Sequence, residues 1–137
     1  MKSIIKFLTL LLLLIVCQNS LAQQEKKIYY DKNWKVVSNQ SKAEYYRLVT
    51  FDANQKPIKT RDYFITGELQ WEGNMTYIDM SDNSKDISNG LCTWYWKNGN
   101  KQRQSTMIND KPDGLTTYYT EKGQVETEIE YKLGVLK

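Results

Sequence analysis

The feature that most constrains the fold is an internal repeat of 24 residues in the C-terminal part of the chain. When residues 113–136 are aligned with residues 89–112, two glycines and one aromatic pair fall on equivalent positions. The coinciding residues are Gly90 with Gly114, Gly99 with Gly123, and Trp94-Tyr95 with Tyr118-Tyr119. A repeat of this length is one supersecondary unit that cannot bury its apolar face alone. The repeat therefore predicts an array of stacked units.

Each unit reads as a β-hairpin with a glycine turn. Asn98-Gly99 indicates a two-residue type I′ turn, because both central residues of that turn need positive φ. Such a turn places Trp96 opposite Lys101 and Trp94 opposite Arg103. In the last unit apolar and acidic residues alternate from Gln124 to Tyr131, which is the period of a half-buried strand.

Two diverged units precede the clear ones. Residues 56–76 carry an equivalent turn at Gly67, and residues 28–51 carry Asn33 where a glycine would stand. Residues 77–88 are polar and read as a longer surface loop. Residues 43–51 favour a strand by composition, with a short helix over 43–48 as the alternative. Residues 23–27 are polar and are expected to fray.

The sequence therefore predicts one all-β domain over residues 23–137. The expected architecture is an antiparallel meander of β-hairpin repeats that forms a single elongated sheet. Each hairpin is expected to contact mainly its neighbours along the array.

Residues 1–22 have the pattern of a secretory signal peptide. Lys2 and Lys6 precede an apolar run over residues 7–16 that holds six leucines, and Ser20-Leu21-Ala22 suits a cleavage site. An apolar run of this length is short for a membrane-spanning helix. Cys17 directly after the run leaves a lipid anchor open as an alternative. We expect an exported protein of the periplasm or cell envelope.

Removal of the signal peptide changes the charge of the chain. The mature part keeps 17 basic and 16 acidic residues, a net charge of +1, so its charge gives no support to nucleic-acid binding. Cys17 leaves with the signal peptide, and Cys92 remains without a second cysteine for an intramolecular disulfide.

The two C-terminal units, residues 90–99 and 114–123, resemble MORN repeats, whose short form is Gly-x-x-x-aromatic-Tyr-x-x-Asn-Gly. Over residues 28–136 the chain resembles exported bacterial MORN-repeat variants of the YwqK antitoxin family, notably in residues 62–73. The chain departs from the motif at Lys122, in place of the turn Asn, and at Asp110, in place of a second Gly. The resemblance implies a β-hairpin array and offers an antitoxin or immunity role.

The residues that usually carry catalysis or bind metals are sparse. The chain holds no His, which removes imidazole bases and imidazole metal ligands. Cys92 reads as a small strand residue, since Thr116 takes the same position in the next unit. Asp82, Ser84 and Asp86 have the alternate spacing of a calcium-binding loop. The glycine and the bidentate carboxylate that such a loop also needs are missing. We expect no catalytic residue, metal or cofactor.

Aromatic residues are the one surplus in the composition. Tyr63, Tyr95 and Tyr119 share one position in successive units and are expected to line one face of the sheet, which we name as the candidate partner-binding face. Half-exposed rings of this kind suit a protein, peptide or glycan surface, and cross-strand aromatic pairing is the alternative reading. The sequence favours a non-enzymatic exported module for binding or scaffolding in the cell envelope. An antitoxin or immunity-type inhibitor of a toxin partner is the alternative.

Overall fold

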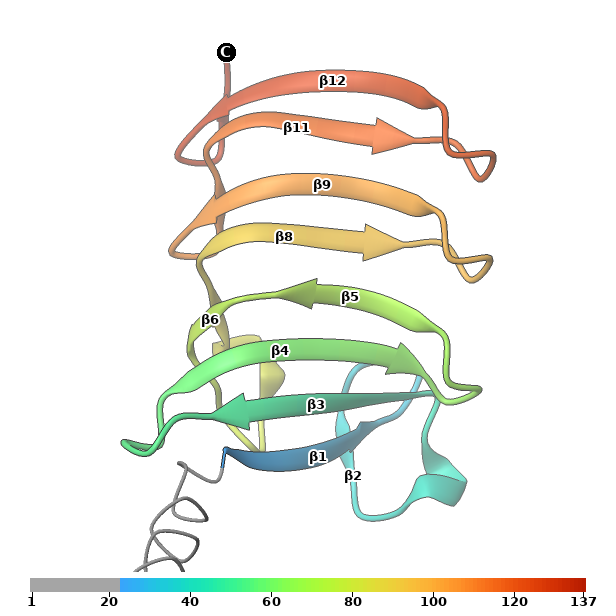
Figure 1. Ribbon diagram of the computed structural model, residues 1–137, viewed down its shortest axis with the longest axis vertical. Coiled ribbons are helices and arrows are strands. Elements are labelled where there is room, and N and C mark those ends of the chain that lie inside the picture. Colours follow the sequence, from blue (N-terminus) through green and yellow to red (C-terminus); the bar gives the residue numbers. More distant parts are fainter. Residues whose placement is uncertain (1–22) are drawn as a thin grey trace, which may run out of the picture.

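The structure, a computed structural model, describes residues 23–137 and consists mainly of antiparallel strands stacked across a long axis (Figure 1). The longer strands are β1 (Gln24–Tyr30), β3 (Tyr45–Phe51), β4 (Pro57–Phe64), β5 (Leu69–Gly73), β8 (Gly90–Tyr95), β9 (Lys101–Ile108), β11 (Gly114–Tyr119) and β12 (Val125–Lys132). The short ones are β2 (Val36–Val37), β6 (Met75–Tyr77), β7 (Ile87–Ser88), β10 (Lys111–Pro112) and β13 (Val135–Leu136). Two 3₁₀ turns, η1 (Gln40–Lys42) and η2 (Asn83–Lys85), complete the fold.

One large sheet confirms the predicted all-β class and antiparallel meander. Its strand order is β13-β12-β11-β9-β8-β5-β4-β3-β1-β2, with β10 paired to the end of β9. From β3 to β12 the order follows the chain, and β1 lies beyond β3 because the loop through η1 returns the chain to the sheet. Strands β6 and β7 form a separate two-stranded ribbon, so the loop expected over residues 77–88 is partly ordered as a strand and a 3₁₀ turn.

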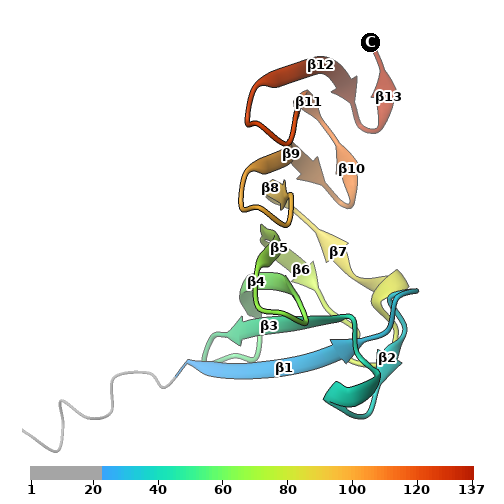
Figure 2. The ribbon, with the colours of Figure 1, turned by 90° about the vertical axis from the view of Figure 1, so that its right-hand side faces the viewer.

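The 24-residue repeat is visible as two units of the same layout. Each has a strand of six residues, a strand of eight and a strand of two, namely β8-β9-β10 and β11-β12-β13. Figure 2 shows the short strands β7, β10 and β13 in a column along one side of the sheet. The repeated arrangement that the sequence predicted is therefore present.

The hairpin turns differ from the expected type I′ turns. The Gly99 N–H donates to the Trp96 carbonyl and the Trp96 N–H donates to the Asn100 carbonyl, so the loop is one residue longer than predicted. Gly99 has φ of +88°, as a type I turn followed by a G1 bulge requires. Tyr95 pairs with Lys101, so the expected pairing of Trp96 with Lys101 is wrong.

The bulge takes up the extra residue, and the register beyond it is as predicted. Trp94 lies opposite Arg103 on β9. The last unit behaves in the same way, with Tyr118 opposite Thr127 and Thr116 opposite Ile129.

Type I′ geometry occurs at the opposite end of the hairpins. Asn109 and Asp110 both have positive φ and join Ile108 directly to its partner Lys111. Leu133 and Gly134 make the same turn one unit later. Asp110 therefore adopts the backbone conformation that Gly134 adopts in the next unit.

Neighbouring units are joined by hydrogen bonds between their turns. The Trp96 indole N–H donates to the Tyr119 carbonyl at 3.1 Å. The Asn98 and Asn100 amides both donate to the Glu121 carbonyl, at 2.8 and 2.7 Å. Asn98 thus serves the stacking of one unit on the next and does not supply a positive φ.

The N-terminal part corrects two further expectations. Residues 24–27 do not fray in the structure, because they pair along β3 in continuous register. The turn after β1 places Trp34, and not Asn33, in the glycine position, with φ of +61°. A bulky residue in this backbone region is rare and costs free energy. Residues 45–51 form a strand, so the helical alternative is excluded.

Two small apolar clusters make up the core. The first holds Ile28, Tyr30, Val49 and Phe51. The second holds Trp71, Met75, Cys92 and Met107. Ile78, from the segment that links β6 to η2, packs against both clusters, so this segment closes the core over one face of the sheet.

The predicted signal peptide, residues 1–22, and Cys17 lie outside the described residues. Between residues 23 and 137 there is no helix with the length and apolar character needed to cross a membrane.

Candidate binding groove

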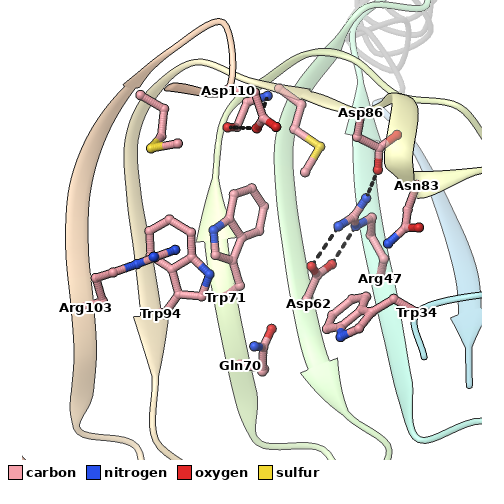
Figure 3. Close-up of a pocket in the computed structure, with 13 residues that line it drawn as sticks. Trp34, Arg47, Asp62, Gln70, Trp71, Asn83, Asp86, Trp94, Arg103 and Asp110 are labelled. Carbon is pink, nitrogen blue, oxygen red and sulfur yellow. Dashed lines mark hydrogen bonds and ion pairs between the residues drawn. The ribbon is translucent and has the colours of Figure 1, made fainter. Parts of the chain in front are cut away.

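A single line of cross-strand partners crosses the sheet at right angles to its strands. The pairs are Arg47 with Asp62, Asp62 with Trp71, Trp71 with Trp94, Trp94 with Arg103, and Arg103 with Tyr118. We call these six residues the cross-strand row. Directly paired residues of an antiparallel sheet project from the same face. The row therefore brings two arginines, one carboxylate and three aromatic rings to one face, and all of these residues except Tyr118 are drawn in Figure 3.

At one end of the row, Arg47 is held by two carboxylates (Figure 3). Its Nε and Nη2 donate to both Asp62 oxygens at 2.6 and 2.8 Å, and its Nη1 donates to Asp86. Burial raises the pKa of the Asp62 carboxyl, and the hydrogen bonds from Arg47 oppose that rise. Arg47 pairs with Asp62 on β4 and with Asp86, the residue that follows η2. It therefore holds the segment after η2 against β3.

Arg103, in contrast to Arg47, forms no ion pair with a carboxylate of the described residues. Its guanidinium lies 3.5 Å from the centroid of the Trp94 ring, a close cation–π contact. Its Nε is buried without a hydrogen-bond partner, and it makes no ion pair with any residue in the described part of the chain. A guanidinium that is stacked on a ring and has no ion-pair partner among the described residues can accept an anionic group.

Two cavities adjoin along the row and share Trp94 and Arg103. The first, of about 420 Å³, lies between the sheet and the β6–η2–β7 segment, with Trp34, Asp86 and Asp110 on its walls. The second, also of about 420 Å³, lies toward the hairpin turns and has among its walls Trp94, Trp96, Gln102, Arg103, Tyr118 and Glu126. Together they form one open depression, which we call the row groove. Each volume lies in the usual range of ligand sites.

Trp34 lies at the rim of the groove in its strained conformation. Its ring stacks on Tyr45 at 4.6 Å and 9°, and lies 5.4 Å from the ring of Tyr30. These contacts offset part of the backbone cost at Trp34. Strained residues that packing holds in place are concentrated at functional sites.

Strand alternation places the predicted partner-binding residues on the opposite face of the sheet, but Tyr119 also lines the second cavity of the groove. Tyr63 stacks on Tyr46 at 4.9 Å, and the Tyr95 hydroxyl donates to Glu72 at 2.6 Å. Tyr119 lies under the Lys101 ammonium, 5.9 Å from its ring centroid. All three predicted tyrosines are half-buried. Each contacts its cross-strand neighbours, so their role as a partner-binding face stays a prediction.

The predicted turn glycines lie at the ends of the strands, away from the groove. Their φ values are all positive, and the residues are Gly67, Gly90, Gly99, Gly114 and Gly123. They shape the hairpins that carry the groove and add no side chain to it.

The remaining reactive groups are engaged in the fold. Burial raises the pKa of the Cys92 thiol to about 11, so the thiol stays protonated at neutral pH. Asp86, which the sequence reading left in an acidic loop, pairs with Arg47 and accepts from the Asp79 amide at 2.8 Å. Within residues 23–137 no cluster of three or more acidic or thiol ligands is placed to hold a metal.

Sequence reasoning missed the ionic end of the row. Arg47 stands at an inward position between Tyr45 and Val49 in a strand of alternating burial, which is an unusual place for a charge. Asp62 follows the buried Thr60 in the same way. A buried charge needs a partner, so these two inward charges on adjacent strands were the available signal.

No protein-family model, curated protein or solved structure matches the chain.

Proposed function

We propose that this protein is a non-enzymatic binding module that is exported to the cell envelope and holds its ligand in the row groove. The observation that carries the proposal is Arg103, stacked on Trp94 and unmatched by any carboxylate of residues 23–137. An arginine that is stacked on a ring and has no ion-pair partner among the described residues is available for recognition of an anionic group.

Two of the four carboxylates that line the groove, Asp62 and Asp86, are engaged in the fold, which supports binding over catalysis. Arg47 and Asp62 satisfy each other in a bidentate pair, and Asp86 is tied to the same arginine. A general acid or base needs a proton that it can exchange with a substrate, and these carboxylates are committed to the fold. The antitoxin alternative rests on the family resemblance alone.

The test is capture of envelope components by crosslinking with the Trp94→Ala variant. We expect Trp94→Ala to lose the partners that the wild-type protein retains, because the variant removes the platform of Arg103. Tyr77→Ala is the matched control, since Tyr77 is 49% exposed on β6 and does not line the groove. Retention of every partner by Trp94→Ala, with loss on substitution of Tyr63 and Tyr95, which do not line the groove, would assign binding to the opposite face.

A further inference from the structure

We infer that the outer edge of β12 is a docking site for one extended, basic segment of a partner protein, which adds a strand to the sheet. The site lies beyond the row groove, at the end of the sheet that carries β12 and β13 (Figure 1). Two features of this edge carry the inference, namely backbone groups that have no strand to pair with and a row of glutamates beside them. The inference does not depend on the proposed function of the groove.

Most of the outer edge of β12 is unpaired in the part of the chain that the structure describes. On one side β12 pairs with β11 over most of its length, whereas on the other side β13 covers only its last two residues. The Lys137 N–H donates to the Glu130 carbonyl at 3.0 Å, so the backbone groups of Glu130 point away from β11. Because backbone direction alternates along a strand, those of Glu128 and Glu126 point outward as well. Free groups of this kind pair readily with an added strand.

The preceding unit shows how a strand fits this edge. Strand β9 is equivalent to β12 by the 24-residue shift, and on the same edge it pairs with the antiparallel β11 through Arg103 and Gln104. The counterparts of these two residues in β12 are Thr127 and Glu128. The repeat therefore sets the place and the direction of the partner strand, which runs antiparallel to β12 and is centred on Thr127 and Glu128.

The side chains of β12 leave apolar surface for such a strand to cover. Ser105 and Met107 of β9 are buried, whereas their counterparts in β12, Ile129 and Tyr131, are only half-buried. Val125, at the start of β12, is 58% exposed. Terminal units of repeat arrays usually carry a polar outer surface, and this unit does not. The partner strand should therefore place apolar residues beside Ile129.

The glutamates of β12 set the charge of the partner. Glu126, Glu128 and Glu130 alternate along the strand, and all three are exposed. Glu130 forms an ion pair with Lys137 at 2.6 Å, whereas Glu126 and Glu128 form none within residues 23–137. Lysine or arginine directly opposite these two residues gives favourable cross-strand pairs. The partner segment should therefore carry basic residues at alternate positions.

The same glutamates disfavour a second copy of β12 at this edge. In an antiparallel pair, residues whose backbone groups point at the partner strand lie opposite each other. Two β12 edges would therefore place glutamate opposite glutamate, and like charges in that position destabilise a sheet. The edge thus selects against pairing with itself and favours a strand of opposite charge.

The experiment measures the binding of three short labelled peptides to the protein by fluorescence anisotropy at one ionic strength. The first peptide alternates Lys with Val or Thr, and the second carries Glu in place of each Lys. The third is the Lys peptide with N-methyl groups on the backbone nitrogens of its lysines. The Lys peptide should bind about tenfold more tightly than either of the others, because only it combines opposite charge with free N–H groups.

Variants of the protein separate charge from backbone pairing. In the double variant Glu126→Gln with Glu128→Gln, the preference for the Lys peptide over the Glu peptide should disappear. The matched control is Glu25→Gln with Glu44→Gln, which removes two exposed glutamates at the other end of the sheet and should keep the preference. Glu128→Pro should abolish binding of the Lys peptide, since proline is tolerated on an edge strand but removes the outward N–H.

Several outcomes would overturn the inference. Equal affinity for the Lys and Glu peptides, equal affinity for the N-methylated peptide, no binding of any peptide, or a preference that survives in the double variant would each do so. A wild-type dimer in sedimentation equilibrium that Glu128→Pro abolishes would assign the edge to a second copy and would also contradict the inference.

Circular dichroism establishes the fold of each variant, and the N-methylated peptide tests backbone pairing without any change to the protein. None of these measurements involves the row groove, so a failure here leaves the proposed function standing, and loss of the proposed function leaves this inference standing.

Discussion

At the scale of single residues, two tyrosines on opposite faces of the sheet should make the stability of the protein fall at alkaline pH. Burial raises the pKa of Tyr30 to about 12. Burial, together with the hydrogen bond to Glu72, raises the pKa of Tyr95 to about 12. The ordinary value of tyrosine is about 10. Above pH 10 the unfolded chain therefore releases protons that the folded protein retains.

Stability should accordingly be unaffected by these groups below pH 10 and should fall as the pH rises from 10 to 12. Tyr95→Phe cannot ionise, so it should make the free energy of unfolding depend less steeply on pH in that window. Urea titrations at several pH values measure this dependence. An unchanged slope in Tyr95→Phe would show that the hydroxyl titrates alike in the folded and unfolded chains.

The residue scale is also where sequence reasoning was weakest. Arg47 and Asp86 are 39 residues apart, and their pairing depends on a segment that was expected to be a surface loop. No local pattern in residues 77–88 reports that Ile78 enters the core. Trp34 was missed because its positive φ follows from packing against Tyr45 and not from its own preference.

At the scale of elements, the hairpin turns depend on single glycines. At Gly99 an added Cβ would meet no atom within 4 Å, so a substitution there is opposed by the backbone alone. Gly99→Ala should lower the free energy of unfolding by about 1 kcal/mol, because φ of +88° suits glycine. Chemical denaturation of the variant measures this loss.

Gly73 gives the contrasting case for the same substitution. Its φ is not positive, but an added Cβ would lie 2.7 Å from the Trp71 ring and 2.8 Å from the Cys92 sulfur. Gly73→Ala should lower stability by about 1–3 kcal/mol through crowding of the core. Equal and negligible losses in both variants would contradict the two mechanisms.

The elements were largely predictable from sequence, and the turns were not. The alternation after Gly123 placed β12 correctly, but the predicted half-burial of this strand is wrong, because only Ile129 and Tyr131 are partly buried. An Asn-Gly pair fits both a two-residue turn and a longer loop with a glycine bulge, because each needs a positive φ at the glycine. The bulge then restores the register, so Trp94 meets Arg103 under either reading.

At the scale of the whole molecule, stability should be a sum over units and their interfaces, as in other repeat arrays. The last unit joins the array through β9–β11 pairing and the turn contacts to Tyr119 and Glu121. A chain that ends at Pro112 should keep the β1–β9 part folded. Its urea dependence of unfolding should be shallower, because less surface is exposed on unfolding.

Circular dichroism and urea unfolding of the truncated chain test this expectation. Complete loss of a cooperative transition would mean that the array folds as one indivisible body.

The overall architecture was the part that the repeat predicted best. Two adjacent copies of one hairpin can bury their apolar faces only against each other, so stacking followed from the sequence. The first units have diverged, and the ribbon β6–β7 has no counterpart in the prediction. The row groove depends on both of these irregular parts, which explains why it was not foreseen.

The strands lie across the long axis, with β1 near one end of the molecule and β13 at the other (Figure 2). Tension applied between these ends would act perpendicular to the strands. It would therefore break the hydrogen bonds between two neighbouring strands one after another, and would not load all of them at once in shear. The protein should therefore yield to a weak pull, strand by strand, and close again when released.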